Sequence, residues 1–237
     1  MVSSGSNPPT DQSVGDQSVA DPGYTLWAVL RRDASADRGT PSGEPLLDAA
    51  PSVEQSGVTI RGFYDVSGLR ADADLMIWLT GATADGLQHA LRTLRRSAEL
   101  GPLLPTWNAL GVHREAEFSR SHAPAYLRGL PPKGWLTVYP FVRSYDWYLL
   151  PEDERRTMLA DHGRAGGAYP QVQTNTVASF ALGDYEWLLA LEADDPLDLV
   201  DLMRHLRSTE ARRHVREEVP FFTGRRVSLD ELSEVLA

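Results

Sequence analysis

Short apolar stretches, several with polar residues at alternate positions, recur along the chain and predict β-strands. The predicted strands cover residues 24–30, 58–66, 74–80, 107–118, 135–143, 175–182 and 185–193. Apolar residues at three- and four-residue spacing predict helices over residues 84–100, 151–163 and 196–217. Residues 34–57 are polar and contain proline and glycine, which fits either a long loop or a helix with a weak signal. Strands and helices mixed in this order predict an α+β fold.

The chain is expected to divide into four segments. Residues 1–22 are rich in Ser, Gly, Pro, Asp and Gln and contain no aromatic residue. Because they cannot bury enough apolar surface to offset the entropy cost of ordering, we expect a disordered tail there. Predicted strands and helices fill residues 23–120 and 135–237, and residues 121–134 connect these two units.

The two units show a weak internal sequence similarity. Residues 75–97 align without gaps on residues 186–208 at an offset of 111, and both segments place a predicted strand before a predicted helix. The few identical pairs include Ala82 and Ala193, Leu91 and Leu202, Arg96 and Arg207, and Ser97 and Ser208. Amphipathic helices resemble one another without common ancestry, so the identities alone leave duplication open, and the shared order of elements favours it. Two antiparallel sheets could then pack together or close into a barrel with a ligand cavity.

Composition narrows the chemistry. The chain of 237 residues has no cysteine, which excludes disulfides, iron–sulfur clusters and thiolate metal sites, so a metal would need histidine, carboxylate or tyrosine ligands. The formal net charge of −10 argues against general binding to nucleic acid or anionic lipid, and an anionic ligand would need local arginines. No stretch approaches the roughly 20 apolar residues of a membrane span, and no secretory signal pattern precedes the first strand, so we expect a cytoplasmic protein.

Local motifs for several common chemistries are lacking. The sequence contains no GxxxxGK[ST], no GxGxxG after a strand and no GxSxG, and its 6 histidines form no HxxxH, HxH or HExxH pair. The glycine-rich residues 163–167 are expected to form a flexible turn. The acidic residues Glu192, Asp194 and Asp195 lack calcium-loop spacing and are expected on solvated turns or at a helix start.

Two features of the second unit are candidates for a binding site. His162 lies three and four positions after apolar residues of a predicted helix, so it leaves from the apolar face. It is either an inward-facing axial haem ligand or a C-terminal histidine stabilised by the helix dipole. On the strand 135–143, Tyr139 and Arg143 share one face and lie about 13 Å apart, which is comparable with the breadth of a porphyrin. The alternative is a half-buried aromatic face with an arginine at its rim.

Residues 139–163, YPFVRSYDWYLLPEDERRTMLADHG, resemble the chlorite dismutase-like haem family and, within it, the coproheme decarboxylases of the actinobacterial type. The resemblance extends with gaps from about residue 24 to VPFFTGRRVSLDEL near the C-terminus. It implies two fused ferredoxin-like modules that form a dimeric α+β barrel, with haem bound by the C-terminal module. It also implies assembly into a homopentamer.

The resemblance carries five residue roles onto this sequence. His162, in LADHG, would be the proximal iron ligand. Tyr139, which opens YPFVR, would be the redox-active residue beside the reacting propionate, and Arg143 would help to bind a propionate. His122, in SRSHAPAYL, would lie on the distal side and accept the peroxide proton. Arg207, at the end of the last amphipathic helix, would contact a further propionate.

The implied activity is hydrogen-peroxide-dependent oxidative decarboxylation of two propionates of iron coproporphyrin III (coproheme) to vinyl groups, giving haem b in haem biosynthesis. Transient contact with the porphyrin-metallating ferrochelatase is implied as well. The alternatives are a haem-binding or haem-transfer protein, a haem peroxidase of the same superfamily, and an α+β barrel that binds a small molecule without haem. Chlorite decomposition is disfavoured, because residues 171–180 correspond to the strand that supplies a distal arginine in chlorite dismutases and contain no arginine. We assign no distal role to Thr174 on that strand.

Overall fold

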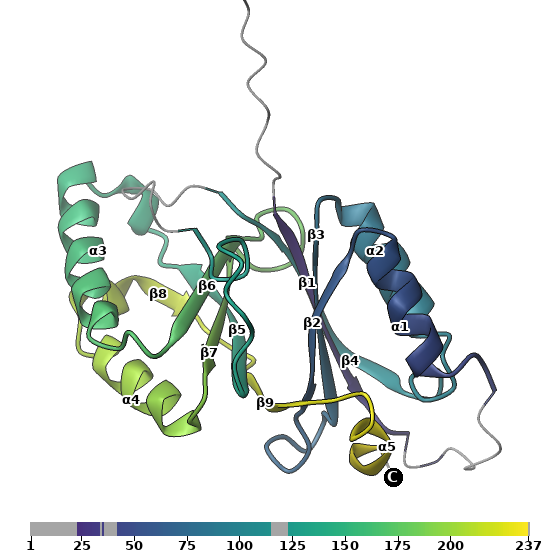
Figure 1. The fold of residues 1–237 in the computed structure, drawn as a ribbon. Helices are drawn as coiled ribbons and strands as arrows, with labels where there is room; N and C mark the ends of the chain where they lie inside the picture. Colours follow the sequence, from purple (N-terminus) through teal and green to yellow (C-terminus); the bar gives the residue numbers. More distant parts are fainter. Residues whose placement is uncertain (1–22, 34, 36–41, 115–122, 237) are drawn as a thin grey trace, which may run out of the picture.

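The computed structural model describes residues 23–33, 35, 42–114 and 123–236 (Figure 1). The strands are β1 (Tyr24–Arg31), β2 (Thr59–Asp65), β3 (Leu75–Gly81), β4 (Leu104–Val112), β5 (Trp135–Arg143), β6 (Gln173–Ala178), β7 (Trp187–Ala193), β8 (Val215–Glu217) and β9 (Phe222–Val227). The helices are α1 (Leu46–Gln55), α2 (Ala84–Leu94), α3 (Glu152–Gly167), α4 (Pro196–Leu206) and α5 (Leu232–Val235), with 3₁₀ turns η1 (Trp147–Leu149) and η2 (Glu210–His214). The predicted tail and His122 lie outside the described residues.

The strand pairings run in a circuit. Their order is β7-β6-β4-β1-β3-β2-β9-β5-β8, and β5 also pairs with β7. We call β1–β4 with α1 and α2 the first half, and β5–β9 with α3 and α4 the second half. Figure 1 shows α1 and α2 on one flank of the molecule and α3 and α4 on the opposite flank, with the strands between them. The pairings between these strands are antiparallel, so the predicted α+β class with antiparallel strands is confirmed.

The halves join at two seams where backbones approach closely. At the β4–β6 seam, a Cβ on Gly111 would lie 2.4 Å from Val177 Cγ2. At the β2–β9 seam, a Cβ on Gly224 would lie 2.8 Å from the Asp65 carbonyl oxygen. Both glycines are therefore required by contact with the neighbouring strand, as is typical where another backbone comes close.

The apolar core has three parts. One lies between the strands of the first half and its helices, and a second, rich in tryptophan, lies between the strands of the two halves. The third, which we call the second-half layer, has the buried residues Tyr139, Val172, Leu191, Ala193, Leu199 and Leu202. The helices of the two flanks differ in how many side chains they bury. The 10-residue α1 buries four side chains, whereas the 16-residue α3 buries only Ala165.

Several element boundaries differ from the sequence predictions. The helix expected to stop at Gly163 continues to Gly167, so the predicted turn at 163–167 is wrong. A glycine lowers helix stability by about 1 kcal/mol relative to alanine without forbidding the helix, and α3 gains contacts with α4 and η2. The helix predicted over 196–217 ends at Leu206, where the Ser208 and Thr209 hydroxyls bond to backbone carbonyls and compete with helical pairing. Residues 34–57 contain a helix, α1.

Candidate functional site

Tyr139 lies in the second-half layer. The predicted alternation along β5 is confirmed, because Tyr139 belongs to this layer while Leu136 and Val138 face the core between the halves. The ring of Tyr139 stacks on Phe221 with centroids 4.4 Å apart, and its hydroxyl donates to Met203 Sδ at 3.5 Å. The side chain is 3% exposed, and this burial, followed by the negative charge of Glu218, raises the pKa of the phenol. Tyr139 is therefore a protonated phenol at neutral pH.

His162 projects from α3 and is partly buried. Its Nδ1 lies 3.1 Å from the Thr209 hydroxyl, just beyond the C-terminal end of α4. Burial lowers the pKa of His162, and the positive charges of Arg143 and Arg207 lower it further. The imidazole is therefore neutral at physiological pH, which is the form that ligates metals.

The two predicted carboxylate-binding arginines lie near His162 from different elements. Arg143 ends β5, and its guanidinium lies over the Trp147 ring at 4.1 Å and over the Phe141 ring at 4.9 Å. Arg207 caps the C-terminal end of α4 and forms an ion pair with Glu218 at 2.8 Å. The positive charges of both arginines act on His162, and Arg207 lies two residues before Thr209, which contacts His162.

The sequence analysis missed several neighbours of these residues. Glu218 pairs with Arg212 as well as with Arg207, and the charges of all three act on Tyr139. Met203 contacts the Tyr139 hydroxyl and Thr209 contacts His162. Periodicity placed Met203 on the apolar face of a predicted helix but did not indicate its contact with Tyr139, and it gave no signal for Glu218, Arg212 or Thr209.

Among the described residues, no side chain of α3 belongs to the buried second-half layer or to the apolar side chains packed against it. On α3, Met158, Leu159 and His162 are each only partly buried, although they point from the same face of the helix. The helix packs mainly on α4 and η2 rather than on the strands. A neutral imidazole, a buried phenol and two arginines around such a layer suit an iron porphyrin, with nitrogen for the metal and guanidinium groups for the carboxylates. The residues present therefore fit this group.

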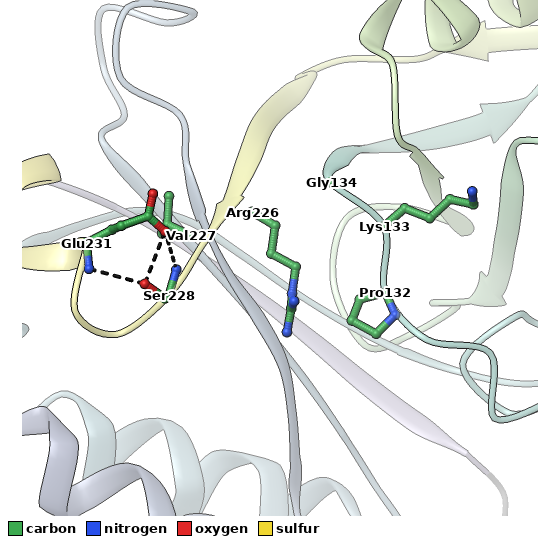
Figure 2. A pocket seen from close by; sticks show the side chains of 7 residues that line it. All are labelled: Pro132, Lys133, Gly134, Arg226, Val227, Ser228 and Glu231. Atoms are coloured by element: carbon green, nitrogen blue, oxygen red, sulfur yellow. Dashed lines mark hydrogen bonds between the residues drawn. The ribbon is translucent and has the colours of Figure 1, made fainter.

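A hollow of about 410 Å³ is lined by other residues (Figure 2). It is lined by Pro132, Lys133, Gly134, Arg226, Val227, Ser228 and Glu231. Its Glu231 carboxylate accepts hydrogen bonds from Ser228 and pairs with Arg225, and Lys133 pairs with Asp194. Because most of the charged groups here already have partners, this hollow is the weaker candidate.

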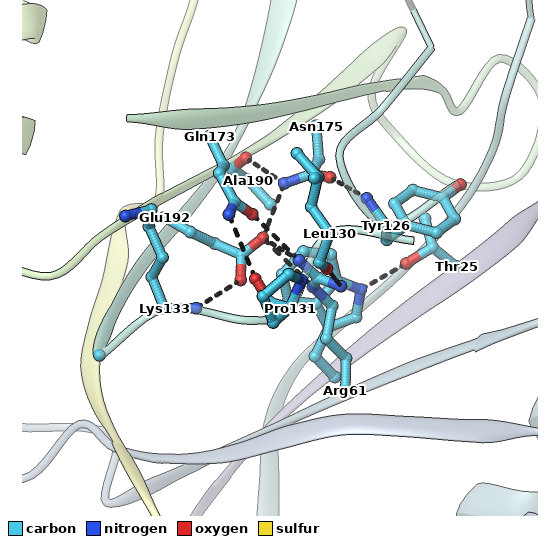
Figure 3. Close-up of polar contacts among 12 residues, drawn as sticks. Thr25, Arg61, Tyr126, Leu130, Pro131, Lys133, Gln173, Asn175, Ala190 and Glu192 are labelled. Atoms are coloured by element: carbon cyan, nitrogen blue, oxygen red, sulfur yellow. Dashed lines mark hydrogen bonds and ion pairs between the residues drawn. The ribbon is translucent and has the colours of Figure 1, made fainter. Parts of the chain in front are cut away.

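A buried polar network lies between the strands of the two halves and joins them (Figure 3). Arg61 on β2 pairs with Glu192 on β7 at 2.6 Å, with side chains 7% and 0% exposed. Glu192 also accepts from Asn175 Nδ2 at 3.0 Å and from the Lys133 backbone N–H. The expectation that Glu192 lies on a solvated turn is therefore wrong, whereas Asp195 caps α4 as expected.

The described part of the chain contains no group of three or more His, Cys, Asp or Glu side chains that could hold a metal ion. A single axial histidine in a porphyrin complex does not require such a group. None of the helices between residues 23 and 236 that the structure describes is both long and apolar enough to cross a membrane.

Known proteins resemble this chain in sequence and in fold. The family model for chlorite dismutase matches residues 42–227. The coproheme decarboxylase of Mycolicibacterium smegmatis is 55% identical over 214 residues, covering 88% of this chain and 90% of the relative. A variant of chlorite dismutase from Candidatus Nitrospira defluvii superposes with a TM-score of 0.76 at 21% identity, covering 92% of this chain and 97% of that one. The same enzyme in complex with imidazole gives a TM-score of 0.73 at 19% identity, with coverages of 92% and 97%.

Proposed function

Because the chain belongs to the chlorite dismutase family, we propose that it decarboxylates coproheme with hydrogen peroxide as oxidant, giving haem b. Each propionic acid group and one hydrogen peroxide give a vinyl group, one CO₂ and two waters, so the complete reaction consumes two peroxides. The observation that supports the proposal is that the buried phenol of Tyr139 contacts Met203 on α4, while His162 contacts Thr209 just after that helix and Arg207 stands at its C-terminal end. This arrangement accompanies 55% identity to a coproheme decarboxylase.

The proposed roles follow from the chemistry of each side chain. His162 would ligate the iron through its neutral imidazole, and the bound iron porphyrin would supply the reduction of peroxide to water and so the oxidising power for the propionate. Tyr139 would give up an electron and a proton and then abstract hydrogen from the propionate; its burial keeps the phenolic proton in place until that step. His122, outside the described residues, would take the peroxide proton.

Arg143 and Arg207 would hold substrate carboxylates. Coproheme carries four carboxylates, and a chain with a net charge of −10 attracts such a ligand only through local positive groups. Arg207 already shares Glu218 with Arg212. A guanidinium has five N–H donors, so Arg207 can bind a substrate carboxylate beside Glu218.

The finer architecture belongs to the same proposal. We infer two ferredoxin-like modules, 23–120 and 135–237, joined by 121–134, in a dimeric α+β barrel preceded by a disordered tail over residues 1–22. In support, the short strand β8 aside, the strands of each half numbered in chain order lie in the order 4-1-3-2: β4-β1-β3-β2 in the first half and β9-β5-β7-β6 in the second. The offset of 111 carries β3 and α2 to within one residue of β7 and α4. A homopentamer in the cytoplasm, in transient contact with ferrochelatase, completes the proposal.

The experiment that tests the function follows porphyrin mass. Iron coproporphyrin III is bound to the purified protein, hydrogen peroxide is titrated, and we expect two successive losses of a carboxylate as CO₂. Tyr139→Phe should bind the porphyrin and leave its mass unchanged, because phenylalanine keeps the ring but has no oxidisable hydroxyl. Unchanged mass in the wild-type protein would favour a haem carrier or a peroxidase, and full turnover by Tyr139→Phe would remove Tyr139 from the mechanism.

Arg143→Ala tests carboxylate binding. A hydrogen bond to a charged group contributes about 1.5–3 kcal/mol, so the Kd for iron coproporphyrin III should rise about 10- to 100-fold. Arg143→Lys is the matched control, because it keeps the charge without the guanidinium fork and should lose less affinity. Fluorescence quenching or absorbance titration measures both. An unchanged Kd in Arg143→Ala would show that this side chain does not bind the substrate.

A further inference from the structure

The contact between His162 and Thr209 joins α3 to the end of α4. The two residues are 47 positions apart in the chain, and Nδ1 of His162 lies 3.1 Å from Oγ1 of Thr209. The same hydroxyl oxygen lies 2.9 Å from the carbonyl oxygen of Leu206 and donates its proton there. Thr209 therefore contacts a predicted ligand residue and the backbone of α4 with one atom.

When both contacts of this hydroxyl are taken as hydrogen bonds, its single hydrogen gives the direction of the His162 contact. A threonine hydroxyl has one hydrogen to donate and two lone pairs to accept with. Since the hydrogen goes to Leu206 O, the contact with His162 requires Nδ1–H to donate to Thr209 Oγ1. A neutral imidazole carries only one N–H, so Nε2 is left as the unprotonated nitrogen with its lone pair free.

We propose that Thr209 is a positioning residue that holds His162 in the Nδ1–H tautomer and thereby presents Nε2 to the substrate iron. The inference rests on the proposed function in so far as it concerns iron. Ligating histidines generally donate their second N–H to a nearby acceptor, which sets both the tautomer and the orientation of the ring. In this chain the acceptor is a neutral hydroxyl anchored by α4, so the imidazole keeps its Nδ1 proton.

Through Thr209, the end of α4 is also tied to α3. Thr209 follows Arg207, which ends α4 and belongs to the proposed carboxylate-binding pair. A shift of the α4 end would therefore move the acceptor of His162 and a substrate-binding guanidinium together. The hydrogen bond therefore links the position of the proposed iron ligand His162 to that of Arg207, the proposed carboxylate-binding residue two positions before Thr209.

The first test uses the substrate-free protein. Long-range ¹H–¹⁵N spectra of histidine-labelled protein report which ring nitrogen of His162 is protonated, with His162→Ala providing the assignment. We expect the Nδ1–H form to dominate in the wild type and in Thr209→Ser, which keeps the hydroxyl. In Thr209→Val, which has the same shape but no acceptor, this preference should be lost. A dominant Nε2–H form in the wild type, or the same tautomer in Thr209→Val as in the wild type, would overturn the proposal.

The second test measures binding of iron coproporphyrin III. Loss of such an acceptor typically costs about 10- to 100-fold in metal affinity, and we expect Thr209→Val to lie in this range. In a His162→Ala background the same substitution should change nothing, because Thr209 acts through the imidazole. An equal loss in both backgrounds would assign Thr209 a merely structural role.

Ser208→Ala is the matched control. Ser208 Oγ donates to the carbonyl of His205 at 2.6 Å, three residues earlier, as Thr209 does to Leu206, but it does not contact His162 in the described structure. It should leave tautomer and affinity unchanged, and a matching loss in Ser208→Ala would trace the effect to the helix end. A wild-type protein with the Nδ1–H tautomer that binds no iron porphyrin would overturn the proposed function and leave the hydrogen bond itself in place.

Discussion

At the residue scale, two buried tyrosines differ in what surrounds their hydroxyls. The Tyr139 hydroxyl contacts Met203 in the second-half layer. Tyr64 is fully buried between the halves, and its hydroxyl has no hydrogen-bond partner among the described residues. Burial, followed by the charge of Glu192, raises the pKa of Tyr64 well above its usual value. The buried Tyr64 hydroxyl therefore lowers the free energy of unfolding of the protein.

Tyr64→Phe should stabilise the protein at neutral pH. Leaving a buried hydroxyl unsatisfied costs about 1–3 kcal/mol, so the free energy of unfolding should rise by about 1 kcal/mol or more. Urea denaturation at pH 7 measures this change. A decrease in the free energy of unfolding would contradict the structure, because it would mean that the hydroxyl has a stabilising partner.

The same variant has a pH dependence whose sign follows from the raised pKa. Above about pH 10 an unfolded tyrosine loses its proton while native Tyr64 keeps it, so the unfolded state binds fewer protons and stability falls as pH rises. The free energy of unfolding of Tyr64→Phe should fall less steeply than that of the wild type between pH 9 and about pH 11. Tyr145→Phe, at a side chain that is 77% exposed, is the control, and an identical fall in wild type and Tyr64→Phe would rule out this account.

At the scale of elements, α1 and α3 occupy equivalent places in the two halves but pack differently. α1 buries apolar side chains against the strands of the first half, whereas α3 is sixteen residues long and buries one. A sequence as polar as PEDERRTMLADHG cannot fill the space over a sheet on its own. Instead, α3 packs mainly on α4 and η2.

Binding of iron coproporphyrin III should protect α3 and α4 selectively. A ligand at about 100 times its Kd adds about 2.7 kcal/mol to stability, and local opening is suppressed most where the ligand makes contact. Hydrogen exchange followed by mass spectrometry should show slower exchange in α3 and α4, with α1 and α2 as the internal control because they face a filled core. Equal slowing in all four helices would indicate global stabilisation without a site in the second half.

At the scale of the whole molecule, the buried network of Arg61 and Glu192 ties the halves together. These two residues are 131 positions apart, and Arg61 also lies over the Trp78 ring at 4.8 Å. Two charges withdrawn from water are tolerated only when each is fully paired. An arrangement of β2 and β7 that separated Arg61 from Glu192 would leave two buried charges unpaired, so the network favours the observed arrangement.

Glu192→Gln should destabilise the protein strongly. Removing one partner of a buried ion pair costs about 3–5 kcal/mol, because the other charge is left uncompensated. The double variant Arg61→Met/Glu192→Gln should lose less than the sum of the single losses, measured by urea denaturation. Asp72→Asn breaks an exposed pair with Arg70 and is the control, expected to cost at most about 1 kcal/mol. Additive losses would show that the two charges do not depend on each other.

The sequence by itself predicted the strands β1–β7 and the helices α2, α3 and α4, whereas β8 lies within a predicted helix, β9 and α5 were not predicted, and α1 was left open between a loop and a helix. The site residues that it proposes are those that could be tied to one segment. The alternation along residues 135–143 places Tyr139 and Arg143, and the motif ending in LADHG singles out His162, because backbone geometry and a family motif are both local in the chain. Helix ends were less certain, since Gly163 is tolerated within α3 by contacts that no local pattern reports.

Only the tertiary structure decided which residues meet. Glu192 reads as a solvated acidic residue because two more carboxylates follow closely, yet the fold buries it against Arg61. Thr209 reads as an ordinary residue within the helix predicted over 196–217, yet that helix ends at Leu206 and the Thr209 hydroxyl reaches His162. Periodicity records which face a side chain takes, whereas its partner depends on how distant strands and helices pack. The choice of partners for His162 and Glu192 is therefore a property of the packed halves.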